Sequence, residues 1–456
     1  MLNRFIAKYF LINKTQILFN WAKSKLQDPN IKEVLSKGGS FFIIRIIGLI
    51  SGYGFTLFVS RVYGAEINGY VALSFSIFLI GSLLPRFGFD INLVKTFSSN
   101  TLEEAKNIYY RVLLLSSIVS FILCFVGIIF NGFFASLLNI NESNYVIYGF
   151  LSLPLWTFTS INAGALRGLK KIKQFSFLTN AGRFIFAIVL VLFGYYVFEF
   201  KNNSSPIIAH TLGLFFLTLY SFYSVQKAIK HVGSKSFIKT SSYLKESYPL
   251  MFSLGLILLL SWTDTIFLGI YTSSSDVGIY NVAFTIAALV GFSLHSLNSI
   301  LAPKIALFYK EDKMKEFNKL LNMAVKINFY TSILAIIFLV FFRTFILGLF
   351  GEEFIAGHYL LLILCVGQFS NALCGPVGVV FQMTGKQKIF QNLVFIAFII
   401  NLALNFALIK PYGYYGAAIS SIVSMSFWNF AGAYLIWKNY KIILIYIPFL
   451  KRKNES

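Results

Sequence analysis

The stretch "RVYGAEINGYVAL" at residues 61–73 has a counterpart far along the chain, "IYTSSSDVGIYNVAF" at residues 270–284. The two stretches align Gly69 with Gly278 at an offset of 209 residues. Such a recurrence indicates an internal duplication, and in membrane transporters a duplication of this length relates two halves of the protein.

The composition around these stretches is that of a polytopic membrane protein. The 456 residues are 57% hydrophobic and 12% charged, and the mean hydropathy is +0.73. A helix of about twenty apolar residues crosses the hydrocarbon core of a bilayer. Runs of this length predict twelve spans, at residues 38–60, 68–94, 111–131, 145–166, 177–198, 207–227, 247–270, 279–302, 323–347, 354–383, 388–409 and 414–437.

A second repeat fixes how the two halves are related. "ALRGLKKIKQFSFL" (165–178) resembles "FQMTGKQKIFQNL" (381–393), and Gly168 aligns with Gly385 at an offset of 217. The members of both repeat pairs are separated by an even number of predicted spans, so the halves have the same orientation. We therefore predict an all-α membrane protein with two parallel six-helix lobes around a central cavity, which suits alternating access.

Lys and Arg residues predict the orientation in the membrane. If the N-terminus is cytoplasmic, the cytoplasmic segments hold 32 of these residues and the outward loops hold four. This bias places both termini in the cytoplasm. It also explains the net charge of +22 without nucleic-acid binding.

The same pattern divides the chain into five predicted segments. Residues 1–37 form a basic segment lying on the cytoplasmic membrane surface. Residues 38–230 form the N-lobe, 231–246 a cytoplasmic linker, and 247–437 the C-lobe. Residues 438–456 form a basic cytoplasmic tail.

Arginines within the spans are candidates for binding an anion, because a buried charge in lipid needs a partner or a cavity. Arg45 shares a helical face with Gly48 and Gly52, which fits either a cation facing a cavity or close helix packing with Arg45 reaching the interface. Arg86 is placed to pair with Asp90 at i, i+4, so a structural ion pair is the alternative to a site. Arg183 either faces a cavity or reaches the cytoplasmic interface.

Asp264 is the acid that most needs an explanation, because it lies in the middle of "LGLILLLSWTDTIFLGIY" (254–271). Burial disfavours its charged form unless a cation is close. The acid therefore either carries a coupling ion, H⁺ or Na⁺, or forms a fixed pair with Arg45 or Arg86. Asp90 is the second ion-coupling candidate.

Three other positions attract attention. His295 corresponds to Arg86 at the 209-residue offset and either lines the cavity or is a satisfied interior histidine. Pro154 and Pro376 interrupt spans four and ten and are candidate hinges, although proline is common in membrane helices. His210 and His358 receive no role.

Motifs that are missing exclude several classes. The chain has no G-x4-G-K-[ST] sequence, so it does not hydrolyse ATP by a P-loop. No metal-ligand spacing, catalytic triad pattern or cofactor motif is found. We therefore predict a secondary transporter rather than an enzyme, without a metal or cofactor.

Three stretches resemble a known family: "LSKGGSFFIIRIIGLISGYGFTLFVSRVYGAEINGYVAL" (35–73), "RFGFDINLVKTFS" (86–98) and "SWTDTIFLGIYTSSSDVGIYNVAF" (261–284). They resemble bacterial polysaccharide-biosynthesis flippases of the Wzx type, which translocate O-antigen (lipopolysaccharide) or capsule repeat units. The resemblance implies the fold of the MOP superfamily, which includes multidrug extruders (MATE) and the lipid II flippase.

The resemblance also implies a substrate and a location. The substrate would be an oligosaccharide on undecaprenyl pyrophosphate, moved from the inner to the outer leaflet of the bacterial cytoplasmic membrane with an ion gradient as driving force. Membrane lipids, a polysaccharide polymerase and a chain-length regulator would be its partners. Arg45, Arg86 and Arg183 are then candidates for the pyrophosphate, since guanidinium groups bind phosphate well.

Two other functions compete with this interpretation. A cation-coupled multidrug antiporter would use an acidic cavity, which Asp90 and Asp264 together would supply. A structural scaffold for polysaccharide assembly would gain nothing from isolated charges inside the membrane, so it is the weaker alternative.

Overall fold

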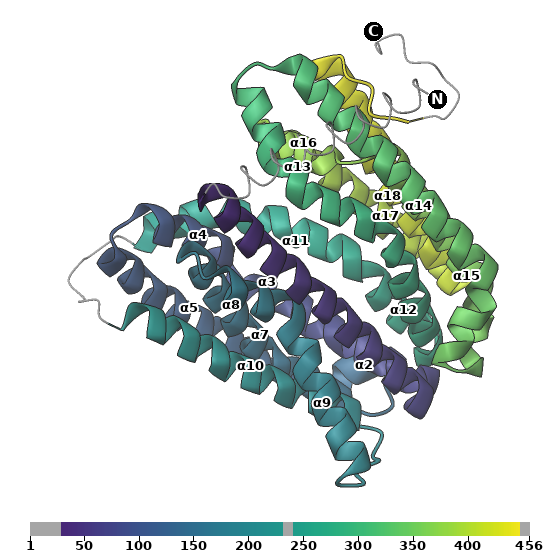
Figure 1. Ribbon diagram of the computed structural model, residues 1–456. Helices are drawn as coiled ribbons and strands as arrows, with labels where there is room; N and C mark the ends of the chain where they lie inside the picture. Colours follow the sequence, from purple (N-terminus) through teal and green to yellow (C-terminus); the bar gives the residue numbers. More distant parts are fainter. Residues whose placement is uncertain (1–28, 231–239, 447–456) are drawn as a thin grey trace, which may run out of the picture.

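The structure, a computed structural model, describes residues 29–230 and 240–446, and every regular element in these ranges is a helix. Figure 1 shows two groups of helices, α2 to α10 and α11 to α18, with α2 and α11 along their border. We call these groups the N-lobe and the C-lobe.

The N-lobe elements follow one another as α2 (Pro29–Gly81), α3 (Leu83–Arg86), α4 (Phe89–Ser99), α5 (Leu102–Ile129), α6 (Asn131–Leu137), α7 (Asn144–Gly168), α8 (Ile172–Ser176), the π-helix η1 (Phe177–Ala181), α9 (Gly182–Tyr196) and α10 (Ser205–Ile229).

The C-lobe elements are α11 (Thr240–Tyr271), α12 (Ser274–Ala288), the 3-10 turn η2 (Leu289–Gly291), α13 (Phe292–Lys310), α14 (Met314–Phe350), the 3-10 helix η3 (Glu352–Gly357), α15 (His358–Cys374), α16 (Val377–Met383), α17 (Gln387–Tyr412) and α18 (Tyr414–Tyr440).

Within the described residues, nine helices are long and apolar enough to cross a membrane, or ten if the bent α11 counts as one span. The multi-pass helical fold is thereby confirmed, while the number twelve stays a prediction. α2 is counted once although it covers two predicted spans, which meet at a kink where Gly64 has φ 84°. α7 follows the predicted span 145–166 but is not among the nine.

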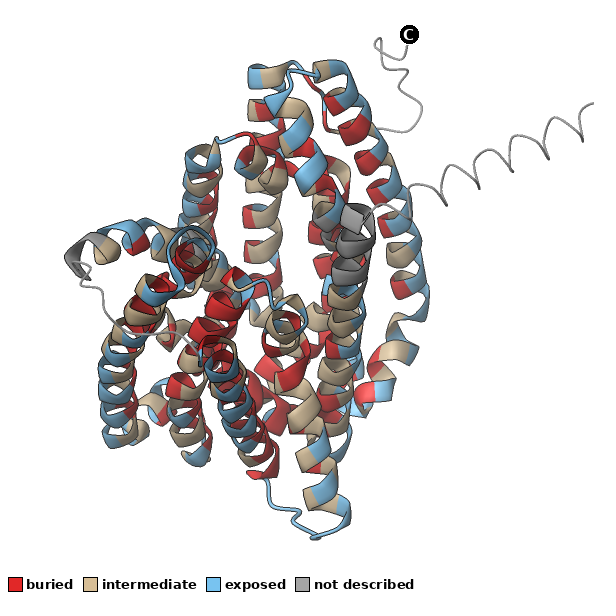
Figure 2. Ribbon diagram, turned by 60° about the vertical axis from the view of Figure 1, so that its left-hand side comes forward, coloured by how far each residue is buried: buried red, intermediate tan, exposed pale blue. Residues whose placement is uncertain are grey.

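The helices are apolar outside and carry small or polar residues inside, as α5 illustrates. Its exposed positions include Leu114, Ile118 and Phe125, whereas its buried face contains Ser116 and Ser120. Figure 2 shows the same distribution across the molecule, with buried residues on the inner faces of the helices. Small residues let neighbouring helices approach closely, and large apolar ones suit contact with lipid.

A polar ladder joins two parallel helices inside the N-lobe. Each rung links a residue of α7 to one of α10 exactly 59 positions later: Ser152–Thr211, Thr159–Thr218 and Asn162–Ser221. A constant separation means that the helices run in the same direction in register. Hydrogen bonds of this kind average well under about 2 kcal/mol each in membrane proteins.

The two repeated glycines meet each other at the border of the lobes. A Cβ atom on Gly69 would lie 1.8 Å from the backbone oxygen of Ser274, and one on Gly278 would lie 2.0 Å from that of Ala65. Only hydrogen fits at these positions, so the repeat glycines allow α2 and α12 to cross in backbone contact. We call this region the closed end of the lobe border.

Polar contacts between the lobes also hold the closed end. The backbone N–H of Ala65 donates to the carboxylate of Glu353 at 2.9 Å, just after the kink at Gly64. Asn281 donates to the side-chain oxygen of Asn68 at 3.1 Å. Asn139 donates to backbone oxygens at the end of α11, including that of Gly269 at 3.0 Å. One cluster of buried apolar residues continues from the N-lobe into this part of the C-lobe.

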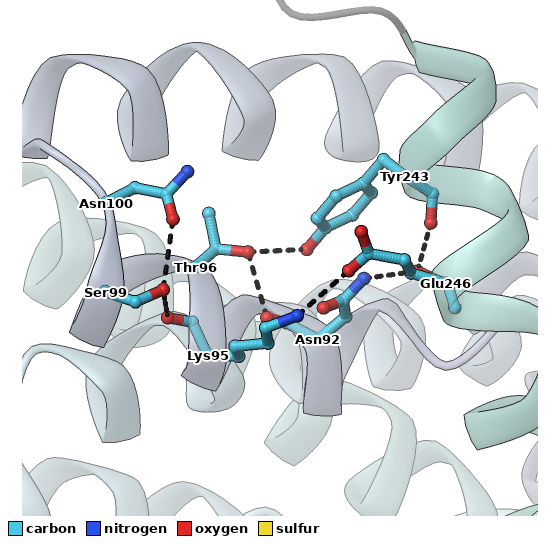
Figure 3. Close-up of polar contacts among 8 residues, drawn as sticks. Asn92, Lys95, Thr96, Ser99, Asn100, Tyr243 and Glu246 are labelled. Carbon is cyan, nitrogen blue, oxygen red and sulfur yellow. Dashed lines mark hydrogen bonds and ion pairs between the residues drawn. The ribbon is translucent and has the colours of Figure 1, made fainter.

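At the opposite end, α4 contacts the first turns of α11, as Figure 3 shows. Asn92 donates to the hydroxyl of Ser247 at 2.9 Å, and the hydroxyls of Thr96 and Tyr243 lie 3.1 Å apart. Lys95 and Glu246 form an exposed ion pair. We call this region the linker end, since α11 begins directly after residues 231–239.

Several element boundaries differ from those expected. α2 begins at Pro29 and α11 at Thr240, so helix extends into the predicted N-terminal segment and linker. Residues 1–28, 231–239 and 447–456 lie outside the described part, and the five-segment division stays a prediction. The backbone N–H of Tyr446 donates to Leu373, so the first residues of the predicted tail pack on the C-lobe.

Candidate functional site

A cavity of about 410 Å³ lies between the lobes, against α2, η1, α9, α11 and α12. Its basic, amide and aromatic lining residues are Arg45, Arg183, Asn180, Asn281, Tyr53, Phe75, Phe184, Trp262 and Phe284. None of the described residues that line it is an aspartate or a glutamate. The cavity is therefore positively charged, with aromatic walls.

Arg45 lines this cavity together with Gly48 and Gly52 of the same helical face. The glycines do not leave the face empty, because a Cβ on Gly48 would lie 2.3 Å from the backbone oxygen of Asn180. They allow η1 to pack closely on α2, as the packing alternative expected. Arg45 faces the cavity, as the functional alternative expected, and no ion pair is found for it among the described residues.

Arg183 is the second cavity arginine, and aromatic rings hold its guanidinium group. The Cζ atom lies 4.3 Å from the ring centre of Phe184, 5.2 Å from Phe75, 5.4 Å from Trp156 and 5.7 Å from Phe78. Cation–π contacts stabilise the charge without using its N–H groups. Those donors therefore remain available to an anion in the cavity.

Arg86 differs from the other two arginines because it pairs with Asp90. The pair bridges a helix break at Phe87 and Gly88, which both have left-handed backbone angles. Neither residue lines the cavity. The geometry thus matches the structural-pair alternative, while roles for Arg86 at the pyrophosphate and for Asp90 as a coupling acid stay predictions.

Asp264 is buried inside the C-lobe, 3% exposed, and four side chains donate hydrogen bonds to its carboxylate. The donors are Tyr280 at 2.7 Å, Asn401 at 3.0 Å, Asn405 at 2.6 Å and Ser421. No Lys or Arg pairs with it among the described residues, so the expected alternative of a fixed pair with Arg45 or Arg86 is wrong. Asp264 also does not line the cavity between the lobes.

The donors around Asp264 were not identified from the sequence. A signal existed in "NLALNFAL", where Asn401 and Asn405 stand at i, i+4 within an apolar run. The carboxylate and hydroxyl oxygens, with the amide oxygens if the side chains turn, form the hard oxygen set that small cations prefer. The Oδ1 atom of Asn405 is buried and has no described partner.

The two prolines behave differently. α7 continues through Pro154 without a break, so the expected interruption is absent there. Pro376 follows Gly375, at φ 64°, and separates α15 from α16. Hinge motion at either proline stays a prediction. The side chain of His295 lies outside the described residues, so its expected role stays open.

Comparison with known proteins gives a family. A profile for polysaccharide biosynthesis proteins matches residues 34–306. The chain belongs to the polysaccharide biosynthesis protein family. A second profile, MatE, matches residues 249–407.

Curated relatives of this family member are distant. The chain is 24% identical over 167 residues to a probable low-salt glycan biosynthesis flippase, Agl15 of Haloferax volcanii, covering 36% of this chain and 35% of the relative. It is 24% identical over 251 residues to the capsular polysaccharide biosynthesis protein CapF of Staphylococcus aureus, covering 53% and 62%. The chain thus matches less than two thirds of either relative.

Solved structures confirm the fold of this family member. An inward-facing multidrug resistance MATE transporter of the MOP superfamily gives a TM-score of 0.71 at 16% identity, covering 88% of this chain and 98% of that one. The lipid II flippase MurJ in an inward closed conformation gives 0.71 at 17% identity, covering 90% of each. At these identities the matches show a shared fold.

Proposed function

We propose that the protein is a flippase that moves an oligosaccharide repeat unit on undecaprenyl pyrophosphate from the inner to the outer leaflet of a bacterial cytoplasmic membrane. The observation that carries this proposal is the cavity between the lobes, which contains Arg45 and Arg183 and no described acid. A pyrophosphate has two or more negative charges, and guanidinium groups bind such anions through paired N–H donors.

The cavity favours this substrate over the cationic drugs of a multidrug antiporter. An antiporter for cations would need an acid in the cavity, but Asp90 is neutralised by Arg86 and Asp264 lies within the C-lobe. We take the match to MatE as a likeness of fold and repeat architecture. The positive charges of Arg45 and Arg183 in the cavity lining disfavour a cationic ligand. Polar and aromatic lining residues suit the sugar part of the substrate, while the polyprenyl chain stays in lipid.

Transport would follow alternating access with both termini in the cytoplasm, as the Lys and Arg distribution predicts. With that orientation, the closed end faces the outside, and the cavity is loaded from the cytoplasmic side. The lobes would then separate at the closed end to release the substrate. A polymerase and a chain-length regulator would use the released product.

Asp264 is our candidate for the coupling ion, H⁺ or Na⁺. It is buried, has no cationic partner among the described residues, and lies among oxygen-bearing side chains of α12, α17 and α18. Binding an ion there would change how these helices pack, so occupancy and lobe position would be linked. Arg45 and Arg183 would hold the substrate, and Asp264 would respond to the gradient.

The test is glycan analysis of a strain that lacks this gene. We expect loss of a surface polysaccharide and accumulation of lipid-linked repeat units that an externally added, membrane-impermeant lectin cannot reach. The wild-type gene should restore the surface glycan, whereas Arg45→Ala and Arg183→Ala should not, although both variants insert normally. Arg343→Ala, at an arginine of α14 outside the cavity, is the matched control. Normal surface glycan with reduced drug tolerance would instead support the antiporter.

A further inference from the structure

The helix α12 takes part both in the buried cluster around Asp264 and in the cavity between the lobes. Tyr280 of α12 donates to the Asp264 carboxylate at 2.7 Å, while the other described donors lie on α17 and α18. The described cavity lining includes no residue of α17 or α18, but it includes four residues of α12 between Asn281 and Ala288. Among the helices that donate to Asp264, α12 is therefore the one that reaches the cavity in the described part of the chain.

The carboxylate of Asp264 is saturated with donors. A carboxylate has about four acceptor positions on its two oxygens, and four side chains donate to this one. Asn401 and Asn405 donate to Oδ1, and the hydroxyls of Tyr280 and Ser421 donate to Oδ2. A cation that binds Oδ2 must therefore take the place of a hydroxyl donor.

The ring of Tyr280 connects this hydroxyl to the wall of the cavity. Tyr280 is 2% exposed, and its ring stacks on that of Phe284, with 5.9 Å between the ring centres and 19° between the planes. Phe284 lines the cavity, as does Trp262, which precedes Asp264 by two residues on α11. Close-packed side chains transmit small displacements, so a shift of the Tyr280 hydroxyl reaches the aromatic wall.

α12 also contacts the N-lobe on both sides of Tyr280 along the chain. Gly278 packs against the backbone of α2 at Ala65. Asn281 donates to Asn68, and the hydroxyl of Tyr53 donates to the backbone oxygen of Thr285 at 2.6 Å. A change in how α12 packs inside the C-lobe is therefore a change at the border of the lobes.

We propose that Tyr280 is a positioning residue that links the occupancy of Asp264 to the substrate cavity and to the contact between the lobes. Without a cation at Asp264, the Tyr280 hydroxyl holds α12 in the packing of this structure, with the lobes together at the closed end. A cation at Oδ2 displaces the hydroxyl and loosens α12, so the cavity releases its anion as the lobes separate. Cation and substrate then weaken each other's binding to the same extent. This inference rests on the proposed function, because it uses the same ion and substrate sites.

The first experiment measures the binding of inorganic pyrophosphate to the full chain in nanodiscs by calorimetry. Asp264→Asn represents a carboxylate whose charge a cation has neutralised, and Tyr280→Phe removes the hydroxyl but keeps the ring on Phe284. We expect either substitution to weaken binding at least about fivefold, the lower end of the usual coupling between two sites. The double variant should bind no more weakly than the weaker single variant, because both substitutions break the same link.

Ser421→Ala is the matched control, since it removes the other hydroxyl from Oδ2 but lies on α18, outside the described cavity lining. We expect it to lower the melting temperature about as much as Tyr280→Phe does and to leave the pyrophosphate affinity unchanged. An equal loss of affinity in Ser421→Ala would show that the loss of any donor has this effect, and it would overturn the role of Tyr280. An unchanged affinity in Tyr280→Phe, or losses that multiply in the double variant, would overturn it as well.

The second experiment needs no ligand and separates this inference from the proposed function. Spin labels on Lys201→Cys and Lys410→Cys, at exposed positions of the two lobes, report the distance between the lobes. We expect Tyr280→Phe and Asp264→Asn to shift this distance to larger values, and Ser421→Ala to leave it unchanged. If the wild type does not bind pyrophosphate, the proposed function fails, and these distances still decide whether Tyr280 links Asp264 to the lobe contact. Unchanged distances in Tyr280→Phe overturn the inference and leave the proposed function intact.

Discussion

Asp264 shows how one buried carboxylate can be stabilised without a cation. Four donors reach its two oxygens from α12, α17 and α18. Hydrogen bonds to a charged acceptor are worth roughly 1.5–3 kcal/mol each, so the set offsets much of the cost of burying the charge. The cluster is therefore built to hold a negative charge without a Lys or Arg partner among the described residues.

Replacing Asp264 by asparagine should separate its structural role as a hydrogen-bond acceptor from its proposed role in binding the coupling ion. The Asp264→Asn variant keeps the shape but loses the charge, so we expect loss of transport and of any increase in melting temperature with added Na⁺ or lowered pH. Its resting stability should fall by about 1–3 kcal/mol, because donors lose a charged acceptor. Thermal melting in detergent measures both effects. A retained ion response in Asp264→Asn would contradict the assignment.

Arg45, Arg86 and Arg183 show why residue type alone does not define a site. All three are arginines in apolar segments, yet Arg86 is neutralised by Asp90 while the other two line the cavity. The i, i+4 spacing of Arg86 and Asp90 indicated that pair correctly. The nearest ring of the Arg183 cage, that of Phe184, is the next residue in the chain, but the other rings, those of Phe75, Phe78 and Trp156, come from other helices and could not be identified from the sequence.

Among the elements, the kink of α2 is the part that holds the lobes together at the closed end. The left-handed Gly64 frees the backbone N–H of Ala65 from α2, and Glu353 of η3 accepts it at 2.9 Å. Arg61 donates in the same region to the backbone oxygens of Gly348 and Leu349. These contacts must break if the closed end opens.

Removing the Glu353 carboxylate should therefore loosen the closed end. We expect Glu353→Ala to shift the lobe equilibrium toward separation by about 1–2 kcal/mol, in the range for a charge-assisted hydrogen bond. Spin labels on Lys201→Cys and Lys410→Cys, both exposed, would report a broader or longer distance distribution. The neighbouring Glu352→Ala, also exposed, should leave it unchanged. Identical distributions in the two variants would show that Glu353 does not hold this end.

At the linker end, buried amide contacts should matter more than the ion pair. Lys95 and Glu246 are 71% and 52% exposed, and such pairs contribute about 0–1 kcal/mol. The bond from Asn92 to Ser247 is buried, so Asn92→Ala removes a buried hydrogen bond worth about 0.5–1.5 kcal/mol, while the Ser247 hydroxyl keeps its bond to the backbone oxygen of Tyr243. We expect Asn92→Ala to lower the melting temperature and Glu246→Gln to change it little. If Glu246→Gln instead lowered the melting temperature more than Asn92→Ala, the ion pair would be the stronger contact at this end.

At the scale of the whole molecule, the structure represents a state in which the two lobes are in contact at the closed end. The repeat glycines bring α2 and α12 into backbone contact, and the cavity lies beside this crossing, with Asn281 present in both. A second cluster of buried apolar residues is confined to α13 to α18 and the chain after α18. The lobes thus share a core at the closed end and also touch where α4 meets α11 at the linker end. The outer part of the C-lobe packs by itself, which suits rigid-body rocking.

A cross-link at the closed end should stop the cycle. The side chains of Asn68 and Asn281 are hydrogen-bonded across the lobes, so Asn68→Cys combined with Asn281→Cys should form a disulfide on oxidation. We expect the surface glycan to be lost under oxidising conditions and restored by a reductant. The native Cys124, Cys365 and Cys374 are buried and should not interfere, and each single variant serves as control. Undiminished transport in the cross-linked protein would exclude opening at this end.

The sequence determined the class of protein through properties that do not depend on distant contacts. Apolar runs specify helices because a backbone in lipid must satisfy its own hydrogen bonds. The repeat around Gly69 and Gly278 specifies two similar lobes, and the pairing of Arg86 with Asp90 follows from local spacing. Each of these features depends on one segment or on the similarity of two segments, so it can be recognised in the sequence without knowledge of tertiary contacts.

Tertiary structure alone decided which polar groups meet. Asp264 meets Asn401 rather than Arg45, and the guanidinium group of Arg183 meets the rings of Phe75 and Trp156. Each outcome depends on which faces of helices distant in the chain come together. Helix periodicity predicts which face of a helix is buried, but it does not predict which residues pack against that face. The positive charge of the cavity therefore depends on how α2, α9 and α12 are arranged around one space.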